Sequence, residues 1–269
     1  MLKAVLGTTK EPFCTAYPVL LPQQQEIANM LLIHANAGGG LSLVIGNPGA
    51  GKSVLREHIE QLGEDRDVIV ASCSRTMHTY MNILKQLADS FKLSASSALA
   101  EKLLIETAFK HASERKTLYI VIDEAHLLDI TTLRKLRLLF DRFPKKYNLV
   151  LLGQPSLLHN LSLNVNQDIK SRVTYSAKLL PLTDEAMATY INRELDTVNL
   201  GQNTFDEEAT MLIIRSADGN VRLCRNLCHG SLIQACKETQ KSVKTSHVNA
   251  VLIQPHWRSH DELIKSQAK

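Results

Sequence analysis

Long apolar runs are missing from this chain. None of its 269 residues lies in an apolar stretch approaching 18, so the sequence predicts no transmembrane helix. Residues 1–10 lack the apolar core of a signal peptide. Internal repeats and low-complexity tracts are absent as well. We therefore expect a cytoplasmic globular protein without a membrane partner.

Cysteine is scarce, and its spacing pairs no two residues in a CxxC motif. The number of cysteines is odd, so we expect reduced thiols: Cys14, Cys73, Cys224, Cys228 and Cys236. Cys224 and Cys228 lie one helical turn apart, and the neighbouring His229 would point about 100° away from them. This favours buried free thiols over a metal site.

An excess of charge of one sign is also absent. The net charge is +4 and the isoelectric point is about 8.7, which permits a nucleic-acid partner without indicating one. With 44% hydrophobic and 22% charged residues, the composition is that of an ordinary globular protein.

Short apolar runs alternate with helical patterns up to about residue 180. Strands are predicted at 41–45, 67–71, 117–122, 148–152 and 172–176. Helices are predicted at 23–36, 51–62, 77–91, 97–113 and 130–141. This alternation is typical of an α/β fold, in which helices sandwich a parallel sheet.

The pattern becomes wholly helical after Pro181. Helices are predicted at 183–199, 205–216, 220–238 and 246–253. We therefore predict a nucleotide-binding domain over 23–180 and a small helical lid over 181–254. Residues 1–22 are rich in prolines and read as a turn-rich N-terminal extension. Residues 255–269 form a C-terminal tail with the only tryptophan, Trp257, which either docks a partner or, as we favour, caps the lid.

A glycine-rich loop follows the first predicted strand. Residues 46–53, GNPGAGKS, match GxxxxGK[ST], in which backbone N–H groups face phosphate oxygens at a helix start. We expect Lys52 to reach the β- and γ-phosphates of ATP and Ser53 to bind Mg²⁺. The predicted nucleotide-binding set here is Gly46, Asn47, Pro48, Gly49, Ala50, Gly51, Lys52, Ser53 and Val54.

Two acids, Asp123 and Glu124, follow the apolar strand at 117–122. Ligands of open parallel sheets bind at the carboxyl ends of strands, which places these acids beside the loop. Asp123 is the predicted Mg²⁺ ligand, and Glu124 the carboxylate that polarises the attacking water. The letters DEAH also spell a helicase box, but one motor domain is too few for such a helicase, and we expect His126 to face the next strand or solvent.

Three further polar residues are candidates for contacts to phosphate. Gln154 ends the strand at 148–152, where it could sense the γ-phosphate. Arg172 precedes the last strand, where it could meet a neighbouring subunit's nucleotide. Arg222 opens a lid helix that could close over phosphate, with Arg225 as the alternative.

These segments together resemble the AAA+ ATPases of the ExeA-like group, which includes transposition helpers of the TnsC, TniB and MuB type. The resemblance covers about residues 20–253 and is carried by GNPGAGKS, IVIDEA, LVLLGQPSLL, DIKSRV and GNVRLCRNLC. It implies a five-stranded parallel sheet with a helical lid, and nucleotide bound between subunits of a ring or filament. It also implies that Lys52 and Ser53 are Walker A, Asp123 and Glu124 Walker B, Gln154 near sensor 1, Arg172 the trans-acting arginine and Arg222 sensor 2.

The function implied is that of an ATP-dependent DNA-binding scaffold for transposition. Such a helper assembles on double-stranded DNA in the ATP state, recruits a transposase and disassembles on hydrolysis. Arg75 and Lys85 are the DNA-contact candidates. The alternative is a cytosolic accessory ATPase of secretion or pilus assembly; the helical segment after 181 argues against a small-molecule kinase.

Overall fold

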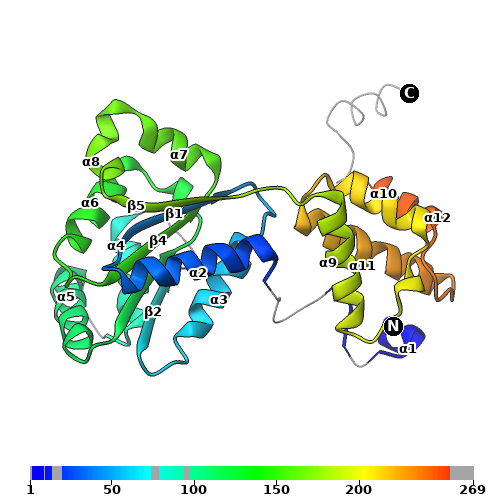
Figure 1. Ribbon diagram of the computed structural model, residues 1–269, viewed down its shortest axis with the longest axis horizontal. Coiled ribbons are helices and arrows are strands. Elements are labelled where there is room, and N and C mark those ends of the chain that lie inside the picture. Colours follow the sequence, from blue (N-terminus) through cyan, green and yellow to red (C-terminus); the bar gives the residue numbers. More distant parts are fainter. Residues whose placement is uncertain (1, 9, 14–19, 74–78, 94–96, 255–269) are drawn as a thin grey trace. The chain divides into compact units, whose positions relative to one another are not determined.

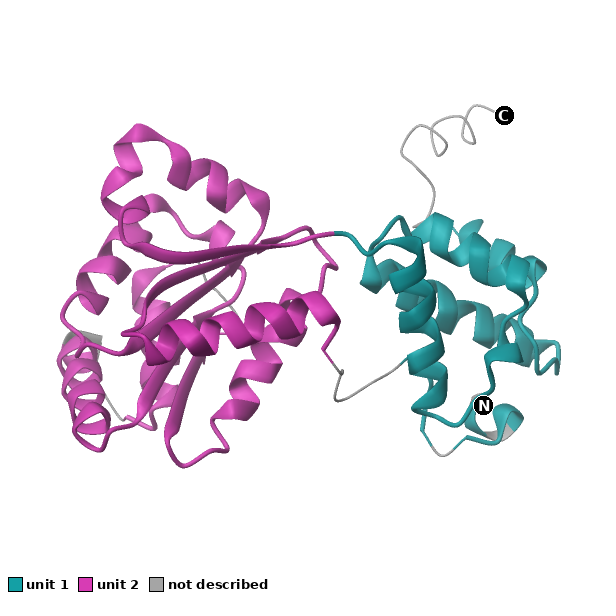
Figure 2. Ribbon diagram, in the orientation of Figure 1, with its two compact units in different colours: residues 1–19, 181–269 teal, residues 20–180 magenta. Residues whose placement is uncertain are grey.

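A computed structural model shows the fold and describes residues 2–8, 10–13, 20–73, 79–93 and 97–254 (Figure 1). The chain divides into two compact units (Figure 2). One comprises residues 20–180; the other joins residues 1–19 to residues 181–269. The first ten or so residues therefore belong with the C-terminal helices and not with the sheet.

Five parallel strands form the centre of the unit 20–180. They are β1 (Gly40–Gly46), β2 (Val68–Cys73), β3 (Thr117–Ile122), β4 (Tyr147–Gly153) and β5 (Val173–Leu179). Their order is β2-β3-β4-β1-β5, with Leu43 of β1 opposite Leu151 of β4 and Ser176 of β5. The predicted α/β fold is confirmed. β5 continues three residues beyond its predicted end at 176.

Helices cover both faces of this sheet (Figure 1). Strand residues alternate between two apolar clusters: Tyr119 and Val121 join one, while Leu118 and Ile120 join the other. The helices on the first cluster are α2 (Pro22–Asn36) and α3 (Lys52–Leu62). Those on the second are α4 (Tyr80–Ser90), α5 (Ser97–Ser113), α6 (Ile130–Phe140), α7 (Pro155–Ser162) and α8 (Gln167–Lys170).

Several short helices were not predicted from the sequence. α7, α8 and the 3₁₀ turn η2 (Asn164–Asn166) lie in the connection from β4 to β5, and a second 3₁₀ turn, η1 (Ala125–Leu127), follows β3. α1 (Leu2–Leu6) lies in the segment predicted to be turn-rich, so that prediction was wrong at this point. Such short elements carry few residues in which a helical period can be recognised.

In its described residues, the second unit contains helices joined by turns and loops, with one isolated bridge between Phe205 and Val243. Its elements besides α1 are α9 (Asp184–Asp196), η3 (Gln202–Thr204), α10 (Glu207–Ala217), α11 (Val221–Lys237) and α12 (Thr245–Leu252). The Thr183 hydroxyl accepts the Ala186 N–H at 3.3 Å, which caps the start of α9 as its sequence indicated. No helix in the described part of the chain is long and apolar enough to cross a membrane.

Candidate nucleotide-binding site

The glycine-rich loop joins the end of β1 to the start of α3. Gly49 and Gly51 have φ angles of 83° and 94°, a left-handed conformation that glycine adopts without the steric cost of a Cβ atom. α3 begins at Lys52 directly after this turn, so the positive end of its dipole faces the loop. The loop therefore has the backbone shape and polarity of an anion-binding site.

Lys52 is held against this loop. Its side chain is buried, and its Nζ donates to the carbonyl oxygens of Gly46 at 2.8 Å and Asn47 at 3.1 Å. A buried ammonium requires such acceptors because desolvation is costly. The positive charge is thus fixed at the loop, where phosphate would bring negative charge.

Asp123 meets Ser53 across this loop. Asp123 is buried at the end of β3, and its Oδ2 lies 3.4 Å from the Ser53 hydroxyl oxygen. Hydroxyl and carboxylate oxygens are the hard ligands that Mg²⁺ takes in phosphate sites. These two residues therefore fit the predicted metal, and each comes from the element that the sequence indicated.

Arg56 also reaches this pair, and the sequence analysis missed it. Its Nη1 lies 3.9 Å from Asp123 Oδ2, and its other nitrogens lie 3.5–3.6 Å from Glu57 and Glu60. The signal was available, because Arg56 follows Ser53 by three residues on α3 and so shares its helix face.

Glu124 occupies a restricted backbone conformation. Its φ is 53°, in the left-handed region, and its N–H donates to Asp123 Oδ1 at 2.8 Å. Its Oε2 lies 3.6 Å from His126 Nε2. The His126 side chain is only 8% exposed, so it does not face solvent, and its backbone lies against Gly153 at the end of β4.

Gln154 lies at the same edge of the sheet as these residues. It follows β4, which is hydrogen-bonded to β1 on one side and β3 on the other, and it precedes α7. Parallel strands bring their carboxyl ends to one edge. The structure therefore gathers Lys52, Ser53, Asp123, Glu124 and Gln154 at one edge of the sheet.

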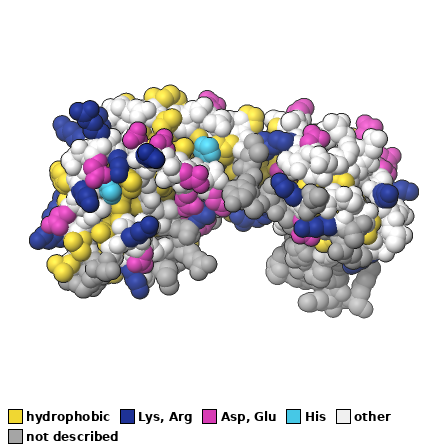
Figure 3. Space-filling model, turned by 90° about the horizontal axis from the view of Figure 1, so that it is seen from below, with side chains coloured by type: hydrophobic (Ala, Val, Ile, Leu, Met, Phe, Trp, Pro, Cys, Tyr) yellow, Lys and Arg dark blue, Asp and Glu magenta, His cyan; other side chains and the backbone are white. Residues whose placement is uncertain are grey.

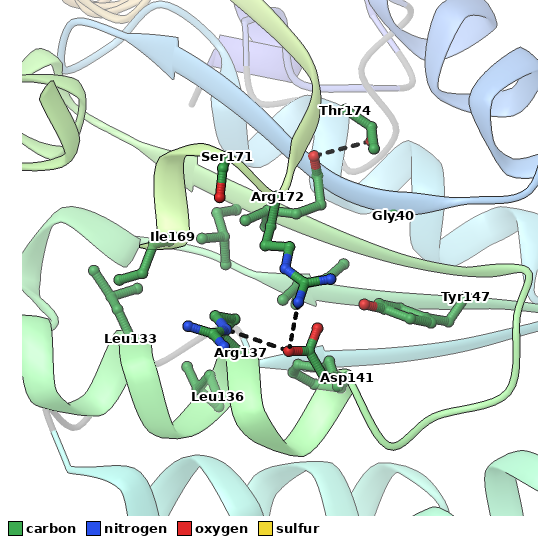
Figure 4. Close-up of a pocket in the computed structure, with 14 residues that line it drawn as sticks. Gly40, Leu133, Leu136, Arg137, Asp141, Tyr147, Ile169, Ser171, Arg172 and Thr174 are labelled. Carbon is green, nitrogen blue, oxygen red and sulfur yellow. Dashed lines mark hydrogen bonds and ion pairs between the residues drawn. The ribbon is translucent and has the colours of Figure 1, made fainter. Parts of the chain in front are cut away.

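Arg172 lies at the opposite edge. It precedes β5, whose seven residues span roughly 20 Å, so it cannot reach the glycine-rich loop of its own chain. Its guanidinium is half exposed and pairs with Asp141 at 3.5 Å, where Arg137 also contacts Asp141 (Figure 4). These charges rim a cavity of about 250 Å³ whose floor is apolar, with Leu133 and Leu136 among its lining residues.

The remaining candidates lie elsewhere. Arg222 and Arg225 are exposed on α11 in the helical unit, where the Asn220 side chain accepts the Arg222 N–H at 3.1 Å. Lys85 is exposed on α4, and Arg75 falls outside the described residues.

The described cysteines are buried free thiols, as expected: Cys73, Cys224, Cys228 and Cys236. Burial raises the pKa of the Cys73 thiol to about 12 and that of Cys228 well above its ordinary value. Within the described ranges, no three His, Cys, Asp or Glu side chains are grouped so as to hold a metal ion.

Residues 35–161 match the family model of the AAA domain. Over 247 residues the chain is 28% identical to general secretion pathway protein A of Aeromonas hydrophila. The chain therefore resembles the ExeA-like AAA+ ATPases. The match covers 87% of this chain but only 45% of that relative, so the chain spans less than half of the relative's length.

Solved structures with low sequence identity share the fold. The Aeropyrum pernix ORC2 protein (ADPNP-ADP complexes) is 14% identical, with a TM-score of 0.72 over 97% of this chain and 74% of its own. Drosophila ORC bound to DNA is 17% identical, with a TM-score of 0.67 over 97% and 66%. The Thermotoga maritima RuvB Holliday junction branch migration motor is 15% identical, with a TM-score of 0.59 over 90% and 74%.

Proposed function

We propose that this AAA+ protein binds ATP with Mg²⁺ and hydrolyses it to ADP and phosphate. The observation that carries the proposal is the meeting of Ser53 and Asp123, with oxygens 3.4 Å apart, beside a loop that fixes a buried Lys52. Two chain segments, residues 46–53 and the end of β3, supply these groups, which a packed core without a ligand role does not need. When bound, the nucleotide supplies the phosphoryl group and Mg²⁺ neutralises its charge.

Each residue of the proposed site has a defined role in nucleotide binding or hydrolysis. Lys52 balances negative charge on the phosphates, and Ser53 with Asp123 holds the metal. Glu124 orients a water molecule and accepts its proton as the water attacks. Gln154, at the adjacent strand end, senses the phosphate that leaves. We also propose Arg222, in the helical unit, as a contact to phosphate.

Completion of the site by a second subunit follows from the position of Arg172. Because its guanidinium lies at the far edge of its own sheet, it can act only on the nucleotide of a neighbouring copy. A head-to-tail contact of this kind closes into a ring or extends as a filament. A guanidinium stabilises the charge that develops on the transferred phosphoryl group.

We propose duplex DNA as the partner of the assembled form, and transposition as the process it serves. ATP would favour assembly on DNA, recruitment of a transposase and, after hydrolysis, release. The DNA-bound and branch-migration proteins among the structural neighbours support this proposal. Basic and acidic side chains are interspersed on the face in Figure 3, so that face offers no continuous basic patch. We assign the DNA contact to Arg75 and Lys85.

A second candidate rests on the secretion protein to which the chain is 28% identical. In this alternative, the same ATP-driven assembly serves an accessory role in secretion or pilus assembly, and duplex DNA is not a ligand. The two candidates share the nucleotide site and differ only in the partner.

Fluorescence anisotropy of a labelled DNA duplex separates the two candidates. Binding is measured with ATP, with ADP and without nucleotide, at two salt concentrations. We expect tight binding with ATP alone, weaker at the higher salt because phosphate contacts release counterions. ATP turnover is measured in parallel on the same sample.

Lys52→Ala and Lys85→Ala are the matched variants. Lys52→Ala removes a buried cation and should lose nucleotide affinity by roughly 100-fold, and DNA binding with it. Lys85→Ala removes an exposed lysine and should weaken DNA binding while leaving ADP affinity unchanged. ATP turnover without DNA binding in any nucleotide state would favour the secretion role, and absence of nucleotide binding would contradict the ATPase proposal.

A further inference from the structure

Gln24 is bound to the glycine-rich loop from outside it. Its side chain is only 2% exposed, and its Nε2 donates to the Gly51 carbonyl oxygen at 3.2 Å. A Cβ atom at Gly51 would collide with this amide, so the contact is close. The Gln24 Oε1 accepts the Leu21 N–H at 2.8 Å, which fixes the side chain at the start of α2.

Gln23, the preceding residue, is bound to a different segment. Its Oε1 accepts the Leu180 N–H at 3.1 Å, and its Nε2 donates to the Leu180 carbonyl oxygen at 2.9 Å. The Gln23 amide thus pairs with both the backbone N–H and the backbone carbonyl of Leu180, the first residue after β5. Leu180 is also the last residue of the unit 20–180, and the chain passes from it into the helical unit.

The two side chains therefore link the loop to the exit of the sheet through one helical turn. This turn is rigid, because Ile27 and Leu31 of α2 are buried against the sheet. A shift of Gly51 must move Gln24 or break its hydrogen bond, and a shift of α2 must do the same at Leu180. Discrete contacts that are either made or broken are what physical coupling between two sites requires.

We infer that Gln23 and Gln24 are positioning residues that couple nucleotide binding at the loop to the order of Leu180. This inference rests on the proposed nucleotide site. ADP, by fixing the loop, strengthens the hydrogen bonds between Gln23 and Leu180. Coupling is reciprocal, so breaking the bonds at Leu180 must weaken ADP binding by the same factor.

Methionine variants of the three consecutive glutamines test this inference. Methionine has a similar length and helix propensity but forms no comparable hydrogen bond. Gln23→Met removes the bonds to Leu180, and Gln24→Met removes those to Gly51 and Leu21. Gln25→Met is the matched control, because Gln25 is exposed and its side chain donates a hydrogen bond to Asn29 on the same helix face.

Two quantities are measured for each variant: ADP affinity by calorimetry, and hydrogen exchange of the Leu180 amide with and without ADP. In the wild type and in Gln25→Met, ADP should slow this exchange by a factor on the order of three to ten. Gln23→Met, which does not touch the loop, should exchange fast in both states and bind ADP more weakly by that same factor. Gln24→Met should bind ADP about tenfold more weakly, and ADP should no longer slow the exchange.

The outcomes distinguish failure of this inference from failure of the proposed nucleotide-binding function. If the wild type binds ADP normally and Gln23→Met and Gln24→Met behave as Gln25→Met does, the inference is overturned and the nucleotide site stands. If the wild type binds neither ADP nor ATP, the proposed function fails and the coupling fails with it. Gln23 is only half buried, so Gln23→Met carries the test even if Gln24→Met unfolds.

Discussion

Glu124 is the residue at which binding and turnover can be separated. Its carboxylate is 42% exposed at the edge of the sheet and, apart from His126 at 3.6 Å, is free to turn toward a water molecule. We expect Glu124→Gln to bind ATP with wild-type affinity and to lose turnover by about 100-fold or more, because an amide accepts no proton. Steady-state hydrolysis and nucleotide anisotropy on one preparation measure both; hydrolysis at the wild-type rate would show that the assigned role is wrong.

The buried thiols give a prediction that depends on pH. Burial raises the pKa of Cys73 to about 12, so folding holds this thiol protonated where an unfolded chain would lose the proton near pH 9. The stability that this contributes is complete below pH 9 and is lost as the pH rises toward 12. In a Cys14→Ser variant at pH 8, a thiol reagent should react slowly until urea unfolds the protein.

Burial of these groups also predicts how stability changes above pH 9. The urea midpoint of the Cys14→Ser variant should fall as the pH is raised from 9, and burial of Tyr119, which raises its pKa to about 12, acts in the same direction. Fast reaction of all thiols in the native protein at pH 8 would contradict the burial on which both predictions, slow thiol reaction and loss of stability above pH 9, depend.

At the scale of elements, the length of each apolar run decided what the sequence could show. All five strands were predictable, because each is a short apolar or β-branched run bounded by turn residues. β5 was recognised only in part: it is an edge strand, and exposed residues such as Thr174 and Lys178 interrupt its apolar pattern. α7 and α8 were missed because they are short: α7 buries only Leu157 and Leu161, and α8 only Ile169.

The start of α11 depends on a cap that the sequence GNVR already contains. The Asn220 side chain accepts the N–H groups of Arg222 and Leu223 at 3.1 and 3.2 Å. Asn220→Ala should therefore lower the free energy of unfolding of the helical unit by about 1 kcal/mol. Thermal unfolding followed by circular dichroism measures this change. Asn226→Ala, exposed later on the same helix, is the control, and equal destabilisation by the two variants would show that the cap contributes nothing.

At the scale of the whole molecule, the motifs identified one part of the site and omitted the contacts that support it. Lys52 and Asp123 belong to patterns that are read locally along the chain. Gln23 and Gln24 act through contacts to residues distant in sequence: Leu180 lies 157 residues beyond Gln23, and Gly51 lies 27 residues beyond Gln24. A single sequence carries no signal for such pairs until the sheet order brings them together.

The position of Arg172 makes the active unit larger than one chain. Arg172→Ala alone and Lys52→Ala alone should each hydrolyse ATP at a small fraction of the wild-type rate, the first for lack of a guanidinium and the second for lack of bound nucleotide. In a mixture, a Lys52→Ala subunit still presents Arg172 to the intact site of an Arg172→Ala neighbour. Random head-to-tail pairing of equal amounts then restores roughly a quarter of the wild-type rate.

This recovery distinguishes action between subunits from a structural role of the Arg172–Asp141 ion pair. The pair is half exposed and worth little to stability, so loss of it should leave the fold intact. If Arg172 served only its own chain, mixing would restore nothing, and the rate would be the average of the two variants. Recovery should also rise with total protein concentration, because the contact that completes the site forms between molecules. A mixture that stays inactive at every concentration would contradict the trans role and, with it, the proposed ring or filament.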